Sequence, residues 1–280
     1  MKSMLRWYGY MGIALILLAE ANFYAVVQPF ATWYIVIVWY GYILFVDSLV
    51  YKVKKGSLIS SYPREFLLIA AMSVPFWLIF EFYNLFTNSW HYTNYLWYVH
   101  LFDFTTILPA VLETFSLLHA LNVGVALDHR PKRTKGRYPG ARTAVKALVL
   151  AGLIATMSPL ILGPPGFLLM WIGMPLMFDP LNYLLGRPSL LQKASIGRRS
   201  VIFQVFIAGL VMGFLWEFWN FQAYAQWHYT LPYPIISSIK LFAMPIEGYF
   251  GYLPFGAAAF LFYAFFRHYA LRHHNNLLGM

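Results

Sequence analysis

A glutamate followed three residues later by an asparagine occurs twice in this chain, each time inside an apolar segment. Glu81 and Asn84 belong to the line Phe-Glu-Phe-Tyr-Asn, and Glu217 and Asn220 belong to Trp-Glu-Phe-Trp-Asn in the second half. Residues three apart lie on one side of a helix, so we expect each amide to hydrogen-bond and orient its carboxyl group. A desolvated carboxyl group keeps its proton and can act as a general acid.

A short aromatic triplet, Trp-His-Tyr, follows each of these pairs. The two triplets are Trp90, His91 and Tyr92 in the first half and Trp227, His228 and Tyr229 in the second. Indole and phenol groups are enriched where a membrane meets water, so an interfacial belt is one explanation. The other explanation is a binding role, in which these six side chains contact a substrate beside the glutamates, together with Asn84 and Asn220.

Eight of the ten carboxyl groups in the chain fall inside strongly apolar segments. They are Glu20, Asp47, Glu81, Asp103, Glu113, Asp179, Glu217 and Glu247. An ionised Asp near the centre of a membrane span costs about 2.5–3.5 kcal/mol, so eight charged and unpaired groups would together cost more than a typical domain's stability. We therefore expect these groups to be protonated, hydrogen-bonded or close to water.

Position within the apolar segments divides these eight groups. Asp47 and Asp179 fall near segment ends, where a structural role is expected. Four others fall deeper or on the opposite side, where they could meet in one cavity, and are the candidate catalytic residues: Glu81, Glu113, Glu217 and Glu247. The structural alternative is that each forms hydrogen bonds between packed helices and so holds them together.

The composition is that of a membrane protein. Of the 280 residues, 60% are hydrophobic and only 11% are charged, whereas about a quarter are charged in a typical soluble domain. A membrane span needs roughly 20 apolar residues. Eight such segments are present, near 7–29, 31–51, 65–88, 99–127, 145–163, 167–186, 200–225 and 239–267. They predict an all-α polytopic membrane protein with eight transmembrane helices.

The basic residues predict how the chain crosses the membrane. All of the 20 Lys and Arg residues except Lys240 lie at the chain ends or in the segments 52–64, 130–146 and 187–199. With eight spans these positions share one side, and the positive-inside rule makes that side cytoplasmic. Topology thus explains the net charge of +10, and no nucleic-acid partner is predicted. We expect a multi-pass protein of the cytoplasmic (inner) membrane with both termini in the cytoplasm.

The chain divides into two related halves. Besides the recurring glutamate and aromatic lines, an aspartate precedes a glycine and a Ser-Leu pair in each half, at Asp47 and at Asp179. Four spans per half return the chain to its starting side, so the halves are expected to be parallel repeats related by an axis along the membrane normal. We predict a first four-helix repeat over 1–129, a basic cytoplasmic linker over 130–144 and a second four-helix repeat over 145–280.

These features together resemble the integral-membrane lycopene cyclase domain, which occurs as paired bacterial subunits or as the cyclase half of fungal bifunctional carotenoid enzymes. The resemblance rests on the Trp-acid pair Trp216 and Glu217, on the Trp-x-Tyr lines and on the Pro-x-Glu line that ends at Glu247. Two positions depart from the family pattern. Gly248 stands where a second glutamate is usual, and the first half has Pro-Ala-Val in place of Pro-x-Glu, with Glu113 nearby.

The resemblance implies acid-catalysed cation chemistry on a carotenoid or another isoprenoid. The expected reaction is cyclisation, hydration or isomerisation, with Glu247 and Glu217 as the leading acids and Glu81 and Glu113 as secondary acids or bases. A different class of function stays open at this point. The chain could be a non-enzymatic lipid or isoprenoid binding or transport protein, in which the same carboxyl groups are polar glue or proton-coupled sites.

No cofactor or metal is predicted. The sequence has no Gly-x-Gly-x-x-Gly or Walker line for a nucleotide and no Asp-Asp-x-x-Asp line for a diphosphate. Cysteine is absent, so a thiolate site is excluded. The expected partners are an apolar isoprenoid or lipid substrate and the surrounding membrane lipids, and nothing in the sequence indicates an oligomer.

The predicted topology can be tested with reporter fusions. A reporter placed after Asn94 should lie on the non-cytoplasmic side of the membrane, because it follows the third span, whereas one placed after Gly140 should lie in the cytoplasm. Reporters that act on only one side of the membrane measure this directly. The same location at both positions would contradict the eight-span topology.

Overall fold

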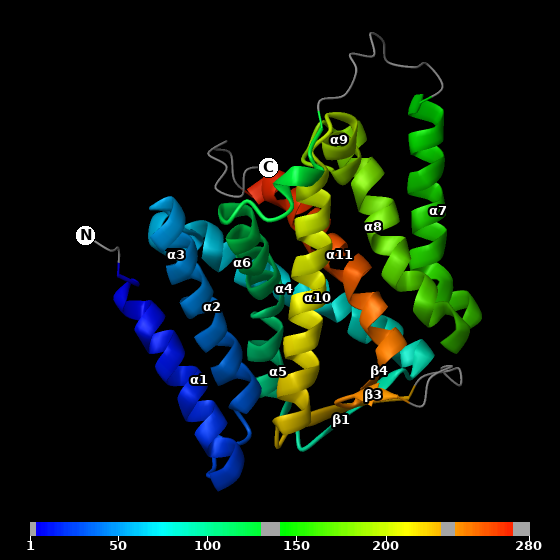
Figure 1. Ribbon diagram of the computed structural model, residues 1–280. Coiled ribbons are helices and arrows are strands. Elements are labelled where there is room, and N and C mark those ends of the chain that lie inside the picture. Colours follow the sequence, from blue (N-terminus) through cyan, green and yellow to red (C-terminus); the bar gives the residue numbers. More distant parts are fainter. Residues whose placement is uncertain (1–3, 130–140, 231–238, 271–280) are drawn as a thin grey trace.

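The computed structural model describes residues 4–129, 141–230 and 239–270, and helices make up most of that chain (Figure 1). The long helices are α1 (Trp7–Ala25), α2 (Tyr34–Lys54), α4 (Pro63–Thr87), α6 (Ile107–Ala120), α7 (Ala141–Leu162), α8 (Phe167–Leu184), α10 (Arg199–Gln222) and α11 (Tyr252–Ala270). The shorter helices are α3 (Leu58–Ser61), α5 (Trp97–Phe104) and α9 (Leu190–Ser195), with 3₁₀ turns η1 (Val125–Leu127), η2 (Pro164–Gly166) and η3 (Ile246–Gly251).

Seven helical stretches are long and apolar enough to cross a membrane, which confirms a polytopic membrane protein. They are α2, α4, α5 with α6, α7, η2 with α8, α10, and η3 with α11. The first predicted span corresponds to α1, a helix of 19 residues that packs along α2. Glu20 and Asn22 lower its apolar content, and it is not among the seven. The count of eight transmembrane helices stays a prediction.

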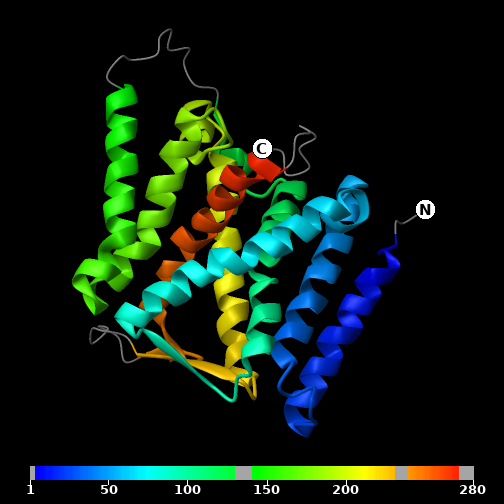
Figure 2. The same ribbon diagram turned by 180° about the vertical axis from the view of Figure 1, so that it is seen from behind.

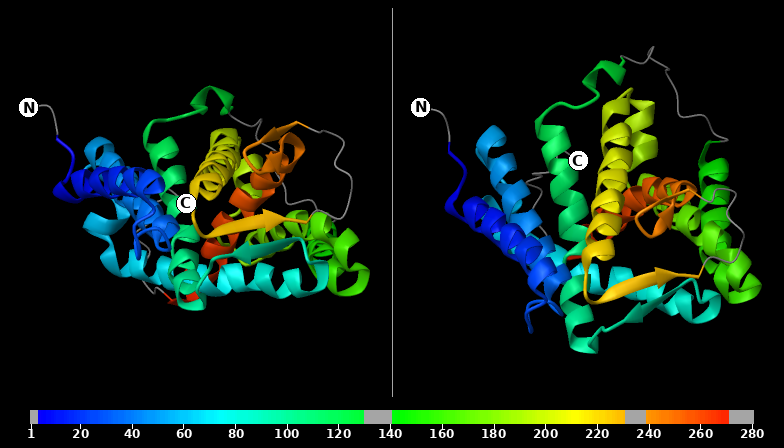
Figure 3. Two further views of the ribbon diagram at one scale, coloured as in Figure 1. Left: turned by 90° about the horizontal axis from the view of Figure 1, so that it is seen from below. Right: turned by 60° about the horizontal axis from the view of Figure 1, so that its bottom comes forward.

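Two short two-stranded sheets interrupt the predicted all-α architecture. β1 (Trp90–Thr93) pairs antiparallel with β2 (Gln226–Tyr229), and β3 (Lys240–Leu241) pairs with β4 (Met244–Pro245). The strands lie across one end of the helix bundle, as Figure 3 shows. The predicted Trp-His-Tyr triplets therefore form strands that contact each other.

The pairing of β1 with β2 is symmetric. His91 lies opposite His228, while Trp90 lies opposite Tyr229 and Tyr92 opposite Trp227. Exchanging the corresponding residues of the two triplets leaves this register unchanged, as a local two-fold axis through the histidine pair would require. The complete parallel four-helix repeats over 1–129 and 145–280 stay a prediction, and residues 130–140 of the predicted linker lie outside the described residues.

A second local arrangement recurs at the other end of the bundle. Asp47 accepts a hydrogen bond from the Ile59 amide at 2.9 Å, and Asp179 accepts one from the Leu191 amide, again twelve residues further on. Each aspartate thereby satisfies the free N–H groups at the start of a short helix, α3 or α9. This geometry agrees with the structural role expected for both residues.

α6 occupies the centre of the bundle. It packs against α2, α4, α10 and α11, while α1 and α7 lie at opposite edges beside α2 and α8. Many of its side chains are fully buried, including Leu108, Leu112 and Phe115. In Figure 2, the view from behind, α4 (cyan) crosses obliquely in front of these helices.

Two predicted spans begin differently from the expectation. The fourth, predicted over 99–127, breaks at Thr105 into α5 and α6. The eighth, predicted over 239–267, begins with β3, β4 and η3, so its regular helix starts at Tyr252. Pro245 therefore lies in β4 ahead of the helix, and the kink that a proline inside the span would cause does not occur there.

Glycine allows α10 and α11 to touch backbone to backbone. A Cβ atom added to Gly209 would lie 2.1 Å from the Tyr252 carbonyl oxygen, and one added to Gly256 would lie 2.6 Å from the Val205 carbonyl oxygen. Gly213 in turn leaves room for the Tyr252 ring, since an added Cβ would lie 2.1 Å from its Cγ. Small residues permit such close helix packing in membranes, and here they fix the side chain of Tyr252 against α10.

We expect Gly209→Ala and Gly256→Ala each to lower the free energy of unfolding by about 1–3 kcal/mol, the usual cost of overpacking. Thermal unfolding of the purified protein in detergent measures the loss. Gly251→Ala is the matched control, because a Cβ atom there meets nothing within 4 Å. Equal melting temperatures for all three variants would contradict the close packing of α10 and α11.

Candidate active site

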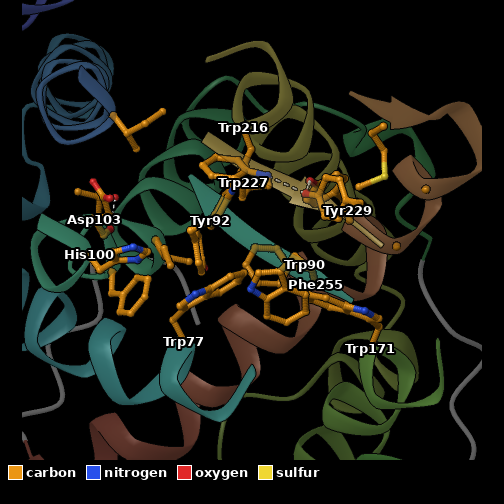
Figure 4. A pocket seen from close by; sticks show the side chains of 18 of the residues that line it. Trp77, Trp90, Tyr92, His100, Asp103, Trp171, Trp216, Trp227, Tyr229 and Phe255 are labelled. Carbon is orange, nitrogen blue, oxygen red and sulfur yellow. Dashed lines mark hydrogen bonds between the residues drawn. The ribbon is translucent and has the colours of Figure 1, made fainter. Parts of the chain in front are cut away.

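A cavity of about 340 Å³ lies between the helices near the β1–β2 strands. Its walls are mainly aromatic, and Figure 4 shows these side chains surrounding the space. The principal wall residues are Trp77, Trp90, Trp171, Trp216, Trp227 and Phe255. No Lys or Arg occurs among the described residues that line it. The space therefore suits an apolar ligand better than a phosphate or another anion.

The indole rings of the walls contact one another across helices. The ring centroids of Trp77 and Trp216 are 5.2 Å apart, those of Trp216 and Trp227 are 5.5 Å apart, and those of Trp77 and Trp90 are 6.0 Å apart. Trp77 comes from α4 and Trp216 from α10, so the cavity depends on both halves of the chain. Aromatic faces carry negative quadrupole charge and attract cations.

Glu81 lies behind one wall. Its Oε1 accepts hydrogen bonds from Trp77 Nε1 at 2.7 Å and Trp90 Nε1 at 3.2 Å, and also from the Tyr92 hydroxyl. All three donors line the cavity, whereas Glu81 itself lines only a shallower pocket at the surface. Three donors on one oxygen satisfy a carboxylate well. The structure thus assigns Glu81 to the support of the aromatic wall.

Glu217 occupies the corresponding place behind the other wall. It is fully buried, and its Oε1 accepts hydrogen bonds from the hydroxyls of Tyr229 and Tyr252, each at 2.6 Å. Trp227 Nε1 donates to the Tyr229 hydroxyl at 2.9 Å, which extends the network. Both tyrosines and Trp227 line the cavity, but Glu217 does not. Any effect of Glu217 on a ligand must therefore pass through these side chains.

The expected amide–carboxylate pairs do not form. Asn84 Nδ2 donates instead to the Trp90 carbonyl oxygen at 2.8 Å, and Asn220 Nδ2 donates to the Trp227 carbonyl oxygen at 2.9 Å. The Trp227 amide returns a hydrogen bond to Asn220 Oδ1 at 2.9 Å. The two asparagines thus fasten the strands to the helix ends, and neither lines the cavity.

The histidines of the two triplets also lie away from the cavity. The rings of His91 and His228 stack with centroids 5.3 Å apart in the strand pair, and His228 Nε2 lies 3.1 Å from Thr93 Oγ1. By contrast, the tryptophans and tyrosines predicted to bind a substrate do line it, namely Trp90, Trp227, Tyr92 and Tyr229.

The sequence predicts that Glu113 lies in one cavity with the other candidate acids. The structure places it elsewhere. It is fully buried in α6, with Asp47 as a neighbouring carboxyl group, and it does not line the cavity. Glu113 belongs to α6, after the break at Thr105, and the α6 residues that line the cavity are at its start, where Ile107 lies. The four predicted acids therefore do not meet in one place.

Two carboxyl groups do line the cavity in the described part of the chain, Glu247 and Asp103. Glu247 lies in η3, is partly exposed, and has a buried Oε2 without a hydrogen-bond partner in the described structure. Asp103 was counted among the carboxyl groups in apolar segments but was not selected as a site residue. A sequence signal did exist for the wall, because Trp77 stands one helical turn before Glu81 and Trp216 stands next to Glu217.

Comparisons with family models, curated proteins and solved structures gave no match for this chain. Within residues 4–129, 141–230 and 239–270, no cluster of three or more His, Asp or Glu side chains is arranged to hold a metal ion. The chemistry of the site must be argued from the cavity itself.

The network behind the second wall can be tested with two tyrosine variants. Tyr229→Phe removes a donor to Glu217 and also leaves Trp227 Nε1 without its acceptor, whereas Tyr252→Phe removes only a donor to Glu217. An unsatisfied buried donor costs about 1–3 kcal/mol. Thermal unfolding should therefore show a larger loss of stability for Tyr229→Phe than for Tyr252→Phe. If Tyr229→Phe loses no more stability than Tyr252→Phe, the result would count against this network.

Proposed function

We propose that the protein catalyses an acid-initiated reaction on a double bond of an isoprenoid, such as a carotenoid, inside the aromatic cavity. The observation that carries the proposal is the buried Oε2 of Glu247, which lacks a hydrogen-bond partner among the described residues and belongs to a cavity walled by indole rings. An unpartnered carboxyl group in an apolar space can exchange a proton with a bound alkene. Cyclisation, hydration and isomerisation all begin with such a proton transfer.

The aromatic walls supply what the reaction intermediate needs. Protonating an alkene leaves a carbocation, and the faces of Trp77, Trp216 and Phe255 can stabilise it through cation–π attraction. Behind these walls, Glu81 and Glu217 accept hydrogen bonds from the indole and phenol groups. A hydrogen bond to a carboxylate makes the donating ring richer in electrons. Glu81 and Glu217 can therefore help to stabilise the cation without touching the substrate.

A carbocation can form by protonation of an alkene or by ionisation of an allylic diphosphate. The residues that line the cavity favour protonation. Ionisation of an allylic diphosphate needs cations that hold the leaving group, and no Lys or Arg lines the cavity in the described chain. A neutral hydrocarbon requires no such residue. This supports a substrate without a phosphate group.

Access to the cavity agrees with a long apolar substrate. Leu168 lines the cavity and is 56% exposed on the outside of α8. Gly248 and Gly251 of η3 also line it, and a Cβ atom on Gly251 would meet nothing within 4 Å. A cavity of about 340 Å³ is at the small end for ligand sites. We infer that one end of the substrate enters while the remainder stays among the membrane lipids.

We expect Glu247→Gln to lower product formation about 10²-fold or more, the usual scale for losing a general acid or base. The measurement is pigment and lipid analysis by chromatography in bacterial hosts that accumulate lycopene or another acyclic isoprenoid and express the protein. Gln has the shape of Glu, so we expect the variant to reach the same protein level as the wild type, and this level is measured in the same membranes.

Glu20→Gln is the control for this experiment. Glu20 accepts hydrogen bonds from Trp219 Nε1 and the Tyr34 hydroxyl away from the cavity, and the amide oxygen of Gln can accept them too. It should keep full activity. A wild-type protein that leaves every isoprenoid unchanged, while binding it, would favour the binding or transport function instead.

A further inference from the structure

Asp103 lies at the other side of the cavity from Tyr229, close to His100 (Figure 4). It comes from α5, is only 8% exposed, and lines the cavity. Neither Oδ1 nor Oδ2 completes a hydrogen bond within the described residues, although the Tyr95 side chain is a close neighbour. Among the described residues, the Tyr95 side chain is the one polar neighbour in hydrogen-bonding range of this carboxyl group, and no cation pairs with it. A buried carboxyl group with so few partners is unusual and calls for a ligand or a proton.

The structure gives Asp103 and Glu247 different surroundings. Asp103 is enclosed, and its residue neighbours in the cavity, Tyr95, His100 and Phe104, are aromatic. Glu247 is partly exposed and has only one oxygen buried without a partner. Burial disfavours the charged form of a carboxyl group, whereas access to water permits it. The two carboxyl groups are therefore suited to opposite tasks.

We propose that Asp103 is the proton donor of the reaction and that Glu247 is the base that completes it. This inference rests on the proposed isoprenoid chemistry and divides the acid and base roles within the same cavity. Glu247 belongs to η3, which leads directly into Tyr252, and the Tyr252 hydroxyl lies 3.4 Å from that of Tyr229. The base thus lies on the Tyr229 side of the cavity, across from Asp103.

The reaction balances with these two groups and the substrate alone. The O–H bond of Asp103 breaks as a C–H bond forms at one alkene carbon, which leaves a cation at the other carbon. A neighbouring double bond attacks that cation and closes a ring. Glu247 then removes a proton from the adjacent carbon, and the electrons of that C–H bond form a new double bond. The product is an isomer, and both carboxyl groups return to their starting states by proton exchange with water.

A route for that exchange lies beside Asp103. Tyr92, Tyr95, His100 and Phe104 line both the cavity and the shallower pocket at the surface, so they form the partition between the two. The ring centroids of Tyr95 and His100 are 4.0 Å apart, and those of Tyr92 and His100 are 4.3 Å apart. Polar groups in this partition can pass a proton inward to Asp103 while the rings keep bulk water out.

The test is deuterium exchange in D₂O with purified protein in lipid discs, using lycopene and shorter acyclic isoprenoids as probes. Glu247→Gln should form about 10²-fold less product, yet the recovered substrate should gain deuterium, because Asp103 can still protonate it and take a proton back. Asp103→Asn should lose both product formation and deuterium exchange. Asp103→Glu keeps an acid at this position and should recover part of both activities.

The outcomes separate this inference from the proposed function. Deuterium in the substrate or product of the wild type, with equal exchange in Asp103→Asn, would overturn the role of Asp103 and leave the proposed function standing. No exchange in the wild type with any probe would overturn the proposed function itself. A lower melting temperature in Asp103→Asn, without recovery of activity in Asp103→Glu, would show a structural role for Asp103 and also contradict the proposal.

Discussion

Hydrogen-bond donors stabilise a carboxyl group inside an apolar bundle, and behind the walls of this cavity those donors are aromatic side chains. Glu81 accepts indole and phenol hydrogen bonds from Trp77, Trp90 and Tyr92. Glu217 accepts phenol hydrogen bonds from two tyrosines. Trp90 and Tyr92 belong to β1, so these hydrogen bonds hold the strand over the end of α4. The hydrogen bond of Tyr229 holds β2 against α10 in the same way, and the two strands pair with each other. The cavity is the space that these aromatic donors enclose.

Other carboxyl groups show the same division of roles, except Glu113, which is buried away from the cavity with no hydrogen-bond partner among the described residues. Asp47 and Asp179 receive backbone N–H groups, and Glu65 pairs with Arg267 at 2.6 Å where α4 meets α11. These groups hold the fold together because their partners satisfy them. Asp103 and Glu247 differ, since they face the cavity with oxygen atoms that have no partner in the described structure. Unsatisfied polar groups in a native protein are expected at functional sites.

The sequence predicted the parts of the site that depend on composition and local spacing. Apolar runs located the seven stretches able to span a membrane, and the recurring lines located Glu81, Glu217 and the aromatic triplets. It failed where helix-to-helix packing decides the outcome. Helical spacing placed Asn84 beside Glu81, but the free backbone of the following strand offered the amide better partners. Such competition cannot be judged before the strand is known to fold back.

The same reason explains why Glu113 was preferred to Asp103. A continuous fourth span would carry both residues on one helix, and depth alone would favour Glu113. The break at Thr105 instead separates α5 from α6, and Asp103 on α5 reaches the cavity while Glu113 does not. In the sequence the break falls at two threonines, and no glycine stands beside them.

The central claim is that an isoprenoid occupies the aromatic cavity, and photo-crosslinking tests it most directly. A diazirine-bearing acyclic isoprenoid would be added to the protein in lipid discs, irradiated, and the labelled peptides identified by mass spectrometry. We expect labels on Trp77, Trp216 and Tyr252, reduced by excess lycopene and by Gly251→Leu, which places a side chain in the open space of η3. Labels confined to lipid-facing residues such as Ile154 and Ile161 of α7, 59% and 77% exposed, would contradict the claim.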